Sequence, residues 1–63
     1  MMSALVVDDE APARQDLGYL LKRSPRIGEV REAEDTATAM ALLRASPADV
    51  VFLYIQMPDL AGL

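Results

Sequence analysis

Histidine and cysteine are both absent from this sequence of 63 residues, and their absence excludes whole classes of chemistry. Zinc fingers, haem or iron–sulfur centres held by those side chains, Ser-His or Cys-His catalytic pairs and disulfide frameworks all need them. A bound metal must therefore be a hard cation with oxygen ligands. Because small secreted domains usually depend on disulfides, a short chain without cysteine is typical of the cytoplasm.

Basic side chains are scarce. Six Lys and Arg residues face ten Asp and Glu residues, which gives a formal net charge of −4. Binding to nucleic acid or to an anionic membrane surface requires clustered basic side chains, and here the six are scattered. We therefore expect this segment to contact neither nucleic acid nor membrane.

Long hydrophobic runs are also lacking. No apolar run approaches the roughly 18 residues that cross a bilayer, and the N-terminus does not resemble an export signal. The apolar content of 52% is nevertheless typical of a folded chain. A domain of this length buries only about 60% of the surface that its unfolded chain exposes, so we expect the sequence to be part of a larger domain.

Hydrophobic periodicity divides the chain into alternating strands and helices. Residues 4–7 form a continuous apolar run, which is typical of a strand buried on both faces. The next segment has apolar residues at helical spacing, Pro12 in its first turn and Asp9 or Glu10 as its expected cap. Asp35 or Thr36 is expected to cap a second helix. The sequence predicts strands at about 4–8, 27–33 and 50–55, helices at about 11–23 and 36–45, and a loop at 56–63.

This order of elements predicts a βαβαβ unit with a parallel sheet. If the strands lie in the order 2-1-3, right-handed crossovers place the two helices on opposite faces. The functional crevice of such a sheet lies at the carboxyl ends of the strands beside the topological switch, here the first and third. Those ends carry Asp8, Asp9 and Tyr54.

The acidic pair Asp8-Asp9 has two interpretations. Adjacent carboxylates at the end of a buried strand repel each other and lose hydration, and a Mg²⁺ ion that keeps several waters would compensate them. Alternatively, Asp9 or Glu10 only caps the following helix and Asp8 is solvated. Arg14, on that helix, is expected to be solvated rather than functional.

Two segments carry a resemblance to a known family. They are Val-Val-Asp-Asp-Glu at 6–10 with Pro12 and Arg14, and Val-Phe-Leu-Tyr-Ile-Gln-Met-Pro at 51–58 with Gly62. Together they closely resemble the receiver domain of two-component response regulators, and most of all the LytTR-type transcriptional regulators. The resemblance implies phosphorelay signal transduction in the cytoplasm. It also implies a flavodoxin-like (CheY-like), doubly wound α/β fold. This chain would hold its first βαβαβ half, a partial receiver domain at 1–63 with strand order 2-1-3.

The resemblance also implies roles for single residues. Asp8 and Asp9 match the acidic pair that holds Mg²⁺, and Gln56 matches the position whose backbone carbonyl is the third protein ligand. Tyr54 stands where the family carries its phosphoacceptor aspartate. A phenol has a pKa of about 10 and is a poor Mg²⁺ ligand, so we expect weakened Mg²⁺ binding and no acyl phosphate at this position.

Tyr54 therefore needs another explanation. It could donate a hydrogen bond to Asp8 or Asp9, block signalling, or plug the site of an inactive relative of the receivers. The resemblance further implies a sensor histidine kinase as partner and a C-terminal DNA-binding effector domain outside this chain. We expect binding rather than enzymatic turnover.

Two alternatives to a receiver remain open. One is a fragment of a Mg²⁺-dependent phosphohydrolase, although such enzymes usually space their acids as Asp-x-Asp. The other is a self-associating half-domain with a vestigial site, in which the unpaired edge of the third strand pairs with another copy.

Overall fold

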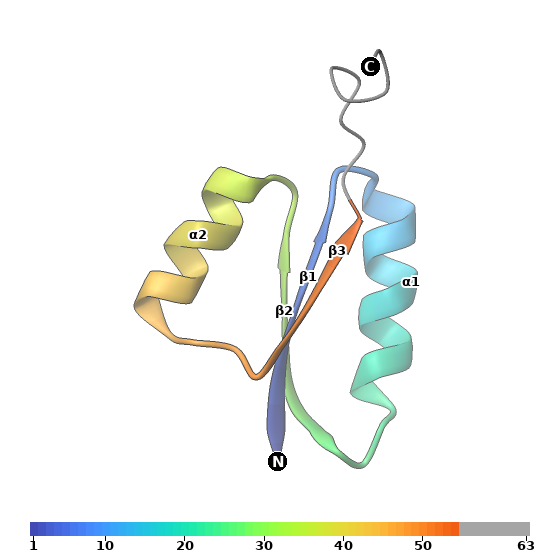
Figure 1. The fold of residues 1–63 in the computed structure, drawn as a ribbon. Helices are drawn as coiled ribbons and strands as arrows, with labels where there is room; N and C mark the ends of the chain where they lie inside the picture. The colour runs from blue at the N-terminus through green and yellow to red at the C-terminus, as the bar shows by residue number, and fades with distance from the viewer. Residues whose placement is uncertain (55–63) are drawn as a thin grey trace, which may run out of the picture.

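The computed structural model describes residues 1–54, which form a three-stranded parallel sheet with one helix on each face (Figure 1). The elements are β1 (Met2–Asp8), α1 (Ala11–Lys22), β2 (Ile27–Ala33), α2 (Thr36–Ala45) and β3 (Val50–Tyr54). The predicted βαβαβ unit and its strand order 2-1-3 are confirmed. Ile55 and the loop expected at 56–63 lie outside the described residues. No helix within the described part of the chain is long and apolar enough to span a membrane.

β1 is the central strand because its run of apolar side chains can be covered on both faces. It pairs in parallel with β2 on one side and with β3 on the other. The four residues at 4–7 are completely buried, as the sequence predicted. β1 starts two residues earlier than expected, because the Met2 amide donates to the Arg26 carbonyl and extends the ladder to β2.

Alternate residues of β1 belong to different layers of the molecule, because side chains of a strand point to opposite faces in turn. Leu5 and Val7 form the core on the α2 side together with Ala33 and Ala39. Three partly buried residues pack against this cluster: Leu42, Leu43 and Ala48. Asp8 lies on the other face, toward α1.

The two helices start in different ways. Asp35 caps α2 as predicted, because its Oδ1 accepts the Thr38 amide hydrogen at 2.7 Å, and this bond holds the pKa of the Asp35 carboxyl below its ordinary value. The expectation that Asp9 or Glu10 caps α1 is confirmed for the position of Glu10 but not for a side-chain hydrogen bond. Glu10 occupies the cap position without a side-chain bond, while the Asp8 carboxylate accepts the Glu10 amide hydrogen at 2.9 Å.

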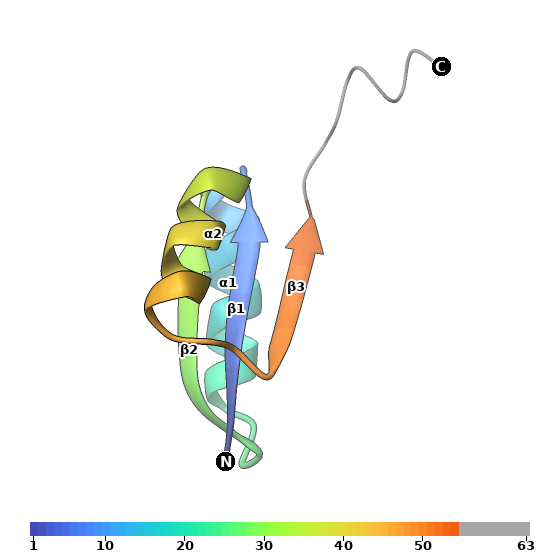
Figure 2. The ribbon, with the colours of Figure 1, turned by 60° about the vertical axis from the view of Figure 1, so that its left-hand side comes forward.

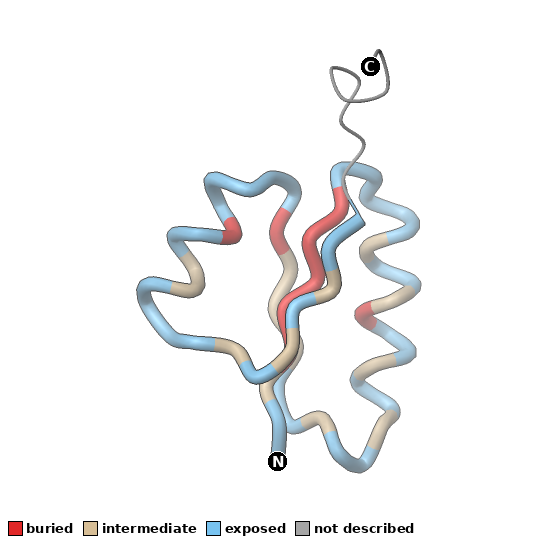
Figure 3. The backbone as a smooth tube through the Cα atoms, in the orientation of Figure 1, coloured by how far each residue is buried: buried red, intermediate tan, exposed pale blue. Residues whose placement is uncertain are grey.

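β3 is the least covered element of the sheet. Both helices pack over β1 and β2, and β3 stands to one side of them (Figure 2). Its side chains are more exposed than their apolar character suggests, with Val51 at 45% and Leu53 at 57%. Figure 3 shows the contrast between buried β1 and largely exposed β3. An apolar strand therefore forms an open edge of the described sheet.

This difference in burial predicts the cost of truncation in the two strands. Leu5→Ala should lower the free energy of unfolding by about 2–5 kcal/mol, because it leaves a cavity in a closed core. That loss can unfold so small a chain outright. Leu53→Ala, the same truncation on β3, should cost clearly less because Leu53 is already more than half exposed. Urea unfolding followed by circular dichroism measures both. Equal costs would contradict the assignment of β1 as the core strand.

Candidate functional site

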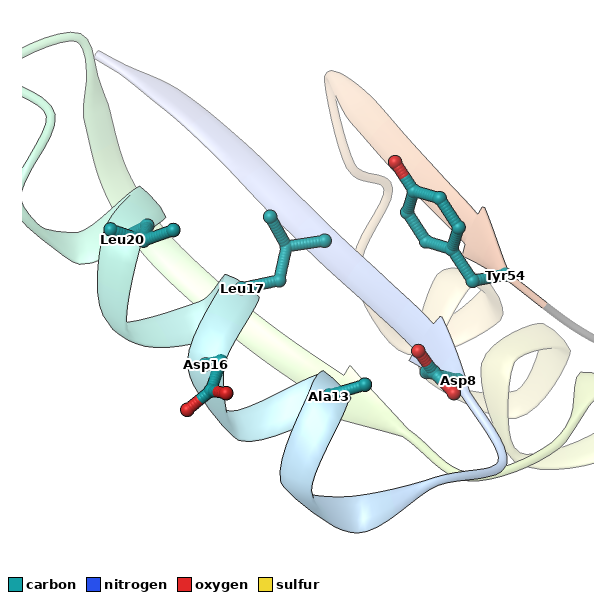
Figure 4. A pocket seen from close by; sticks show the side chains of 6 residues that line it. All are labelled: Asp8, Ala13, Asp16, Leu17, Leu20 and Tyr54. Carbon is teal, nitrogen blue, oxygen red and sulfur yellow. The ribbon is translucent and has the colours of Figure 1, made fainter.

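Asp8 and Tyr54 lie next to each other at the carboxyl ends of β1 and β3. The two strands are parallel and their register runs from Ala4 opposite Val50 to Asp8 opposite Tyr54. Register partners in a parallel pair have side chains on the same face of the sheet. Asp8 and Tyr54 accordingly line one cleft of about 380 Å³ (Figure 4). Four residues of α1 complete its lining: Ala13, Asp16, Leu17 and Leu20.

Asp8 is a buried carboxylate with defined partners. Its residue is only 8% exposed, and its Oδ1 accepts the Glu10 amide hydrogen. Its backbone carbonyl accepts a hydrogen bond from Arg14 Nη1 at 2.8 Å. The interpretation of Asp8 as a solvated residue is therefore wrong, because the β1–α1 loop folds back over its side chain. Burial of a carboxylate requires such partners.

Asp9 completes the acidic pair on the solvent side. It is exposed, directly after β1, and its carboxylate is accessible to a ligand. Hard oxygen donors of this kind fit Mg²⁺, which needs only one or two protein carboxylates and keeps several waters. Residues 1–54 contain no cluster of three or more acidic, histidine or cysteine side chains that could hold a metal ion. Gln56, the third ligand implied by the resemblance, lies outside the described residues.

Tyr54 forms one wall of the cleft. Its residue is more than half exposed, and its ring leans back along β3 so that the hydroxyl lies toward the start of the strand rather than over Asp8 (Figure 4). Within the described part of the chain, no hydrogen bond joins the Tyr54 hydroxyl to Asp8 or Asp9. One of the three roles considered for the phenol was to donate a hydrogen bond to Asp8 or Asp9. This arrangement does not show that role.

Arg14 departs from its expected role as a solvated residue. Its side chain is 17% exposed and contacts both the Asp8 carbonyl and the Glu32 carboxylate. The covered face of α1 runs through 14, 17, 18 and 21, a helical spacing of three and four residues. That spacing can be recognised in the sequence. Arg14 is nevertheless expected on the solvent face of the helix, because a charged side chain is usually exposed.

Comparison with known proteins gives the class of the chain. Residues 4–63 match the response regulator receiver domain, so the chain belongs to this family. Receiver domains are signalling modules of two-component systems rather than classical enzymes, and they generally depend on Mg²⁺. The βαβαβ unit with its 2-1-3 order is the corresponding part of that fold.

Three relatives show which response regulators the chain is similar to. Sensory transduction protein LytT of Bacillus cereus is 44% identical over 59 residues, which is 94% of this chain and 24% of the relative. Sensory transduction protein LytR of Staphylococcus epidermidis is 40% identical over 62 residues, 98% of this chain and 25% of the relative. A response regulatory protein of Vibrio cholerae is 40% identical over all 63 residues and 27% of its own length. The chain thus spans about a quarter of the length of these relatives. No solved structure matches significantly.

Proposed function

We propose that this chain is receiver sequence from a LytT/LytR-like response regulator in which Tyr54 occupies the phosphoacceptor position. One observation carries the proposal. Tyr54 is the last residue of β3 and the register partner of Asp8, at the strand end where a receiver needs its reactive carboxylate beside the acidic pair. The match to the receiver family also favours this function over a Mg²⁺-dependent phosphohydrolase.

The substitution changes what the site can do. A carboxylate at this position attacks phosphorus as an anion and also contributes a negative oxygen to the metal. A phenol is a far weaker acid than a carboxylic acid and a poor Mg²⁺ ligand, so it supplies neither. An acyl phosphate therefore cannot form at Tyr54. The ring instead occupies the wall of the cleft, which makes this receiver insensitive to the usual phosphoryl input.

Asp8, Asp9 and the backbone carbonyl of Gln56 are the groups that would hold Mg²⁺. The bound ion would supply positive charge opposite a phosphoryl group. Two carboxylates are enough for a weak site, but the third acidic oxygen is replaced by a neutral one. The Mg²⁺ affinity of this chain is consequently low.

The proposal extends to partners through the relatives. These relatives are sensory transduction proteins and a response regulatory protein. By that likeness, the parent protein is a cytoplasmic regulator of transcription with a sensor histidine kinase as its upstream partner and a DNA-binding effector domain after the receiver. This segment contributes binding rather than turnover. It makes no contact with nucleic acid, because its net charge is −4 and its basic residues are scattered.

Self-association is a second candidate property, favoured by the exposure of β3. Val51 and Leu53 are apolar and half exposed, and no charged residue interrupts β3. Open apolar edges without charges readily pair with another strand. Two copies joined through β3 would form one continuous sheet.

The Mg²⁺ proposal is tested by restoring the carboxylate. Titration calorimetry should show weak or undetectable Mg²⁺ binding to the native sequence and a clear gain, at least about tenfold, for Tyr54→Asp, because the third acidic oxygen returns. Tyr19→Asp, on an exposed position of α1, is the matched control and should show no gain. Unchanged affinity in a folded Tyr54→Asp chain would remove the basis of the receiver-site assignment.

Self-association is tested by sedimentation velocity at several concentrations. The average mass should rise with concentration, and Leu53→Lys should return the chain to a monomer because a charge on the edge strand opposes pairing. Met40→Lys places the same charge on a half-exposed position of α2 and should leave the association unchanged. A monomer at every concentration of the native chain is the outcome that rules this property out.

A further inference from the structure

Arg14 connects three elements beneath the acidic loop. It lies in the first half of α1, its Nη1 donates to the Asp8 carbonyl at the end of β1, and its Nε lies 3.3 Å from Glu32 Oε1 on β2. The side chains of Arg14 and Glu32 are only 17% and 30% exposed. Ion pairs that are shielded from water attract each other more strongly than ion pairs on the surface.

Gly18 makes room for this arrangement. A Cβ at position 18 would lie 3.0 Å from Glu32 Oε2, which is closer than most real contacts. The Glu32 carboxylate therefore lies against the helix backbone at Gly18 while its other oxygen faces Arg14. A glycine inside a helix costs roughly 1 kcal/mol relative to alanine. At this position the missing side chain lets Glu32 approach α1 and pair with Arg14.

The guanidinium group suits both contacts at once. Its donors lie in a rigid plane, so one edge can serve a carboxylate while another nitrogen serves a carbonyl. The Asp8 carbonyl belongs to the peptide unit that joins Asp8 to Asp9. Fixing that peptide fixes the direction in which the chain leaves β1, and with it the placement of Asp9 and the Glu10 amide that donates to Asp8.

We propose that Arg14 is a positioning residue for the acidic loop at 8–10, with Glu32 holding the guanidinium in place. This inference depends on the proposed function in one respect, which is the assignment of the loop carboxylates as Mg²⁺ ligands. Arg14 itself touches no ligand. It sets the backbone from which Asp9 would reach Mg²⁺, in the way that outer partners orient metal ligands.

Two substitutions separate this role from general stabilisation. Arg14→Lys keeps the charge but cannot reach the Asp8 carbonyl and Glu32 with one planar group. Glu32→Gln keeps Arg14 and removes its charged partner. Arg44→Gln, which removes a guanidinium from an exposed position of α2, is the matched control. All comparisons are made at a temperature where circular dichroism shows each variant folded.

The first measurement needs no metal. In the native background, Arg14→Lys should change the NMR chemical shift of the Glu10 amide and speed its hydrogen exchange, because the loop that holds this amide on Asp8 is loosened. Glu32→Gln should cause a smaller change in the same direction. Both substitutions should leave the amides in the middle of α2 unaffected. In the Arg44→Gln chain, the Glu10 amide should keep its native chemical shift and exchange rate.

The second measurement uses Mg²⁺ alone as the probe, in chains that also carry Tyr54→Asp. Arg14→Lys should weaken Mg²⁺ binding about tenfold or more, as changes in outer partners of metal ligands do. Folded Arg14→Lys and Glu32→Gln chains with a native Glu10 amide and native Mg²⁺ affinity would overturn the proposal. If Tyr54→Asp itself gains no affinity, the proposed function fails, while the Glu10 amide still decides the role of Arg14. If Arg14→Lys does not fold, the same two measurements on Glu32→Gln decide that role.

Discussion

The register between β1 and β3 is the constraint on which the rest of the site depends. It places Asp8 opposite Tyr54 and puts both side chains on the face that α1 covers. A slip of one residue would send Tyr54 to the other face of the sheet, away from the acidic pair. The register is held at the start of β3, where the Asp49 amide donates to the Ser3 carbonyl at 3.0 Å and the Asp49 carboxylate accepts the Ser3 amide hydrogen at 2.8 Å.

The acidic loop depends on the same strand. Three consecutive acidic residues follow the apolar run of β1. Hydrogen bonds hold the loop that carries them in place. The Asp8 carboxylate accepts from the Glu10 amide, and Arg14 donates to the Asp8 carbonyl. The site thus has the supporting structure of an acidic pocket, while the register position opposite Asp8 carries the phenol of Tyr54.

The sequence was sufficient for those features that depend on local patterns. The apolar run at 4–7 predicted a doubly covered strand, and Asp35 was recognisable as a cap because the residue and its helix are adjacent. The course of the β1–α1 loop was not predictable in this way, because Asp8, rather than Asp9 or Glu10, turns back to bind the loop amide. Periodicity gives the face on which a residue lies but not the direction of a loop.

The unpaired edge of β3 was expected from the sequence, but the burial of Arg14 and the exposure of the β3 side chains were not predictable, for a related reason. A charged side chain on a helix is usually solvated, and only the three-dimensional position of Glu32 beside Gly18 makes Arg14 an internal partner. An apolar strand is usually covered, and only the placement of both helices over β1 and β2 leaves β3 open. Both outcomes depend on contacts between distant segments. The placement of Asp8 and Tyr54 at one edge of the sheet was predictable, because parallel strands bring their carboxyl ends together. Their likeness to a receiver site came from the resemblance of the two motifs.

The central claim is that the phenol at position 54 replaces the carboxylate that accepts a phosphoryl group. Intact-mass spectrometry after incubation with acetyl phosphate and Mg²⁺ tests it most directly, with a receiver that carries the aspartate as proof that the reagent is active. We predict that the native chain keeps its unmodified mass while the aspartate-bearing receiver gains a phosphoryl group. A phosphoryl adduct located on Tyr54 would contradict the claim.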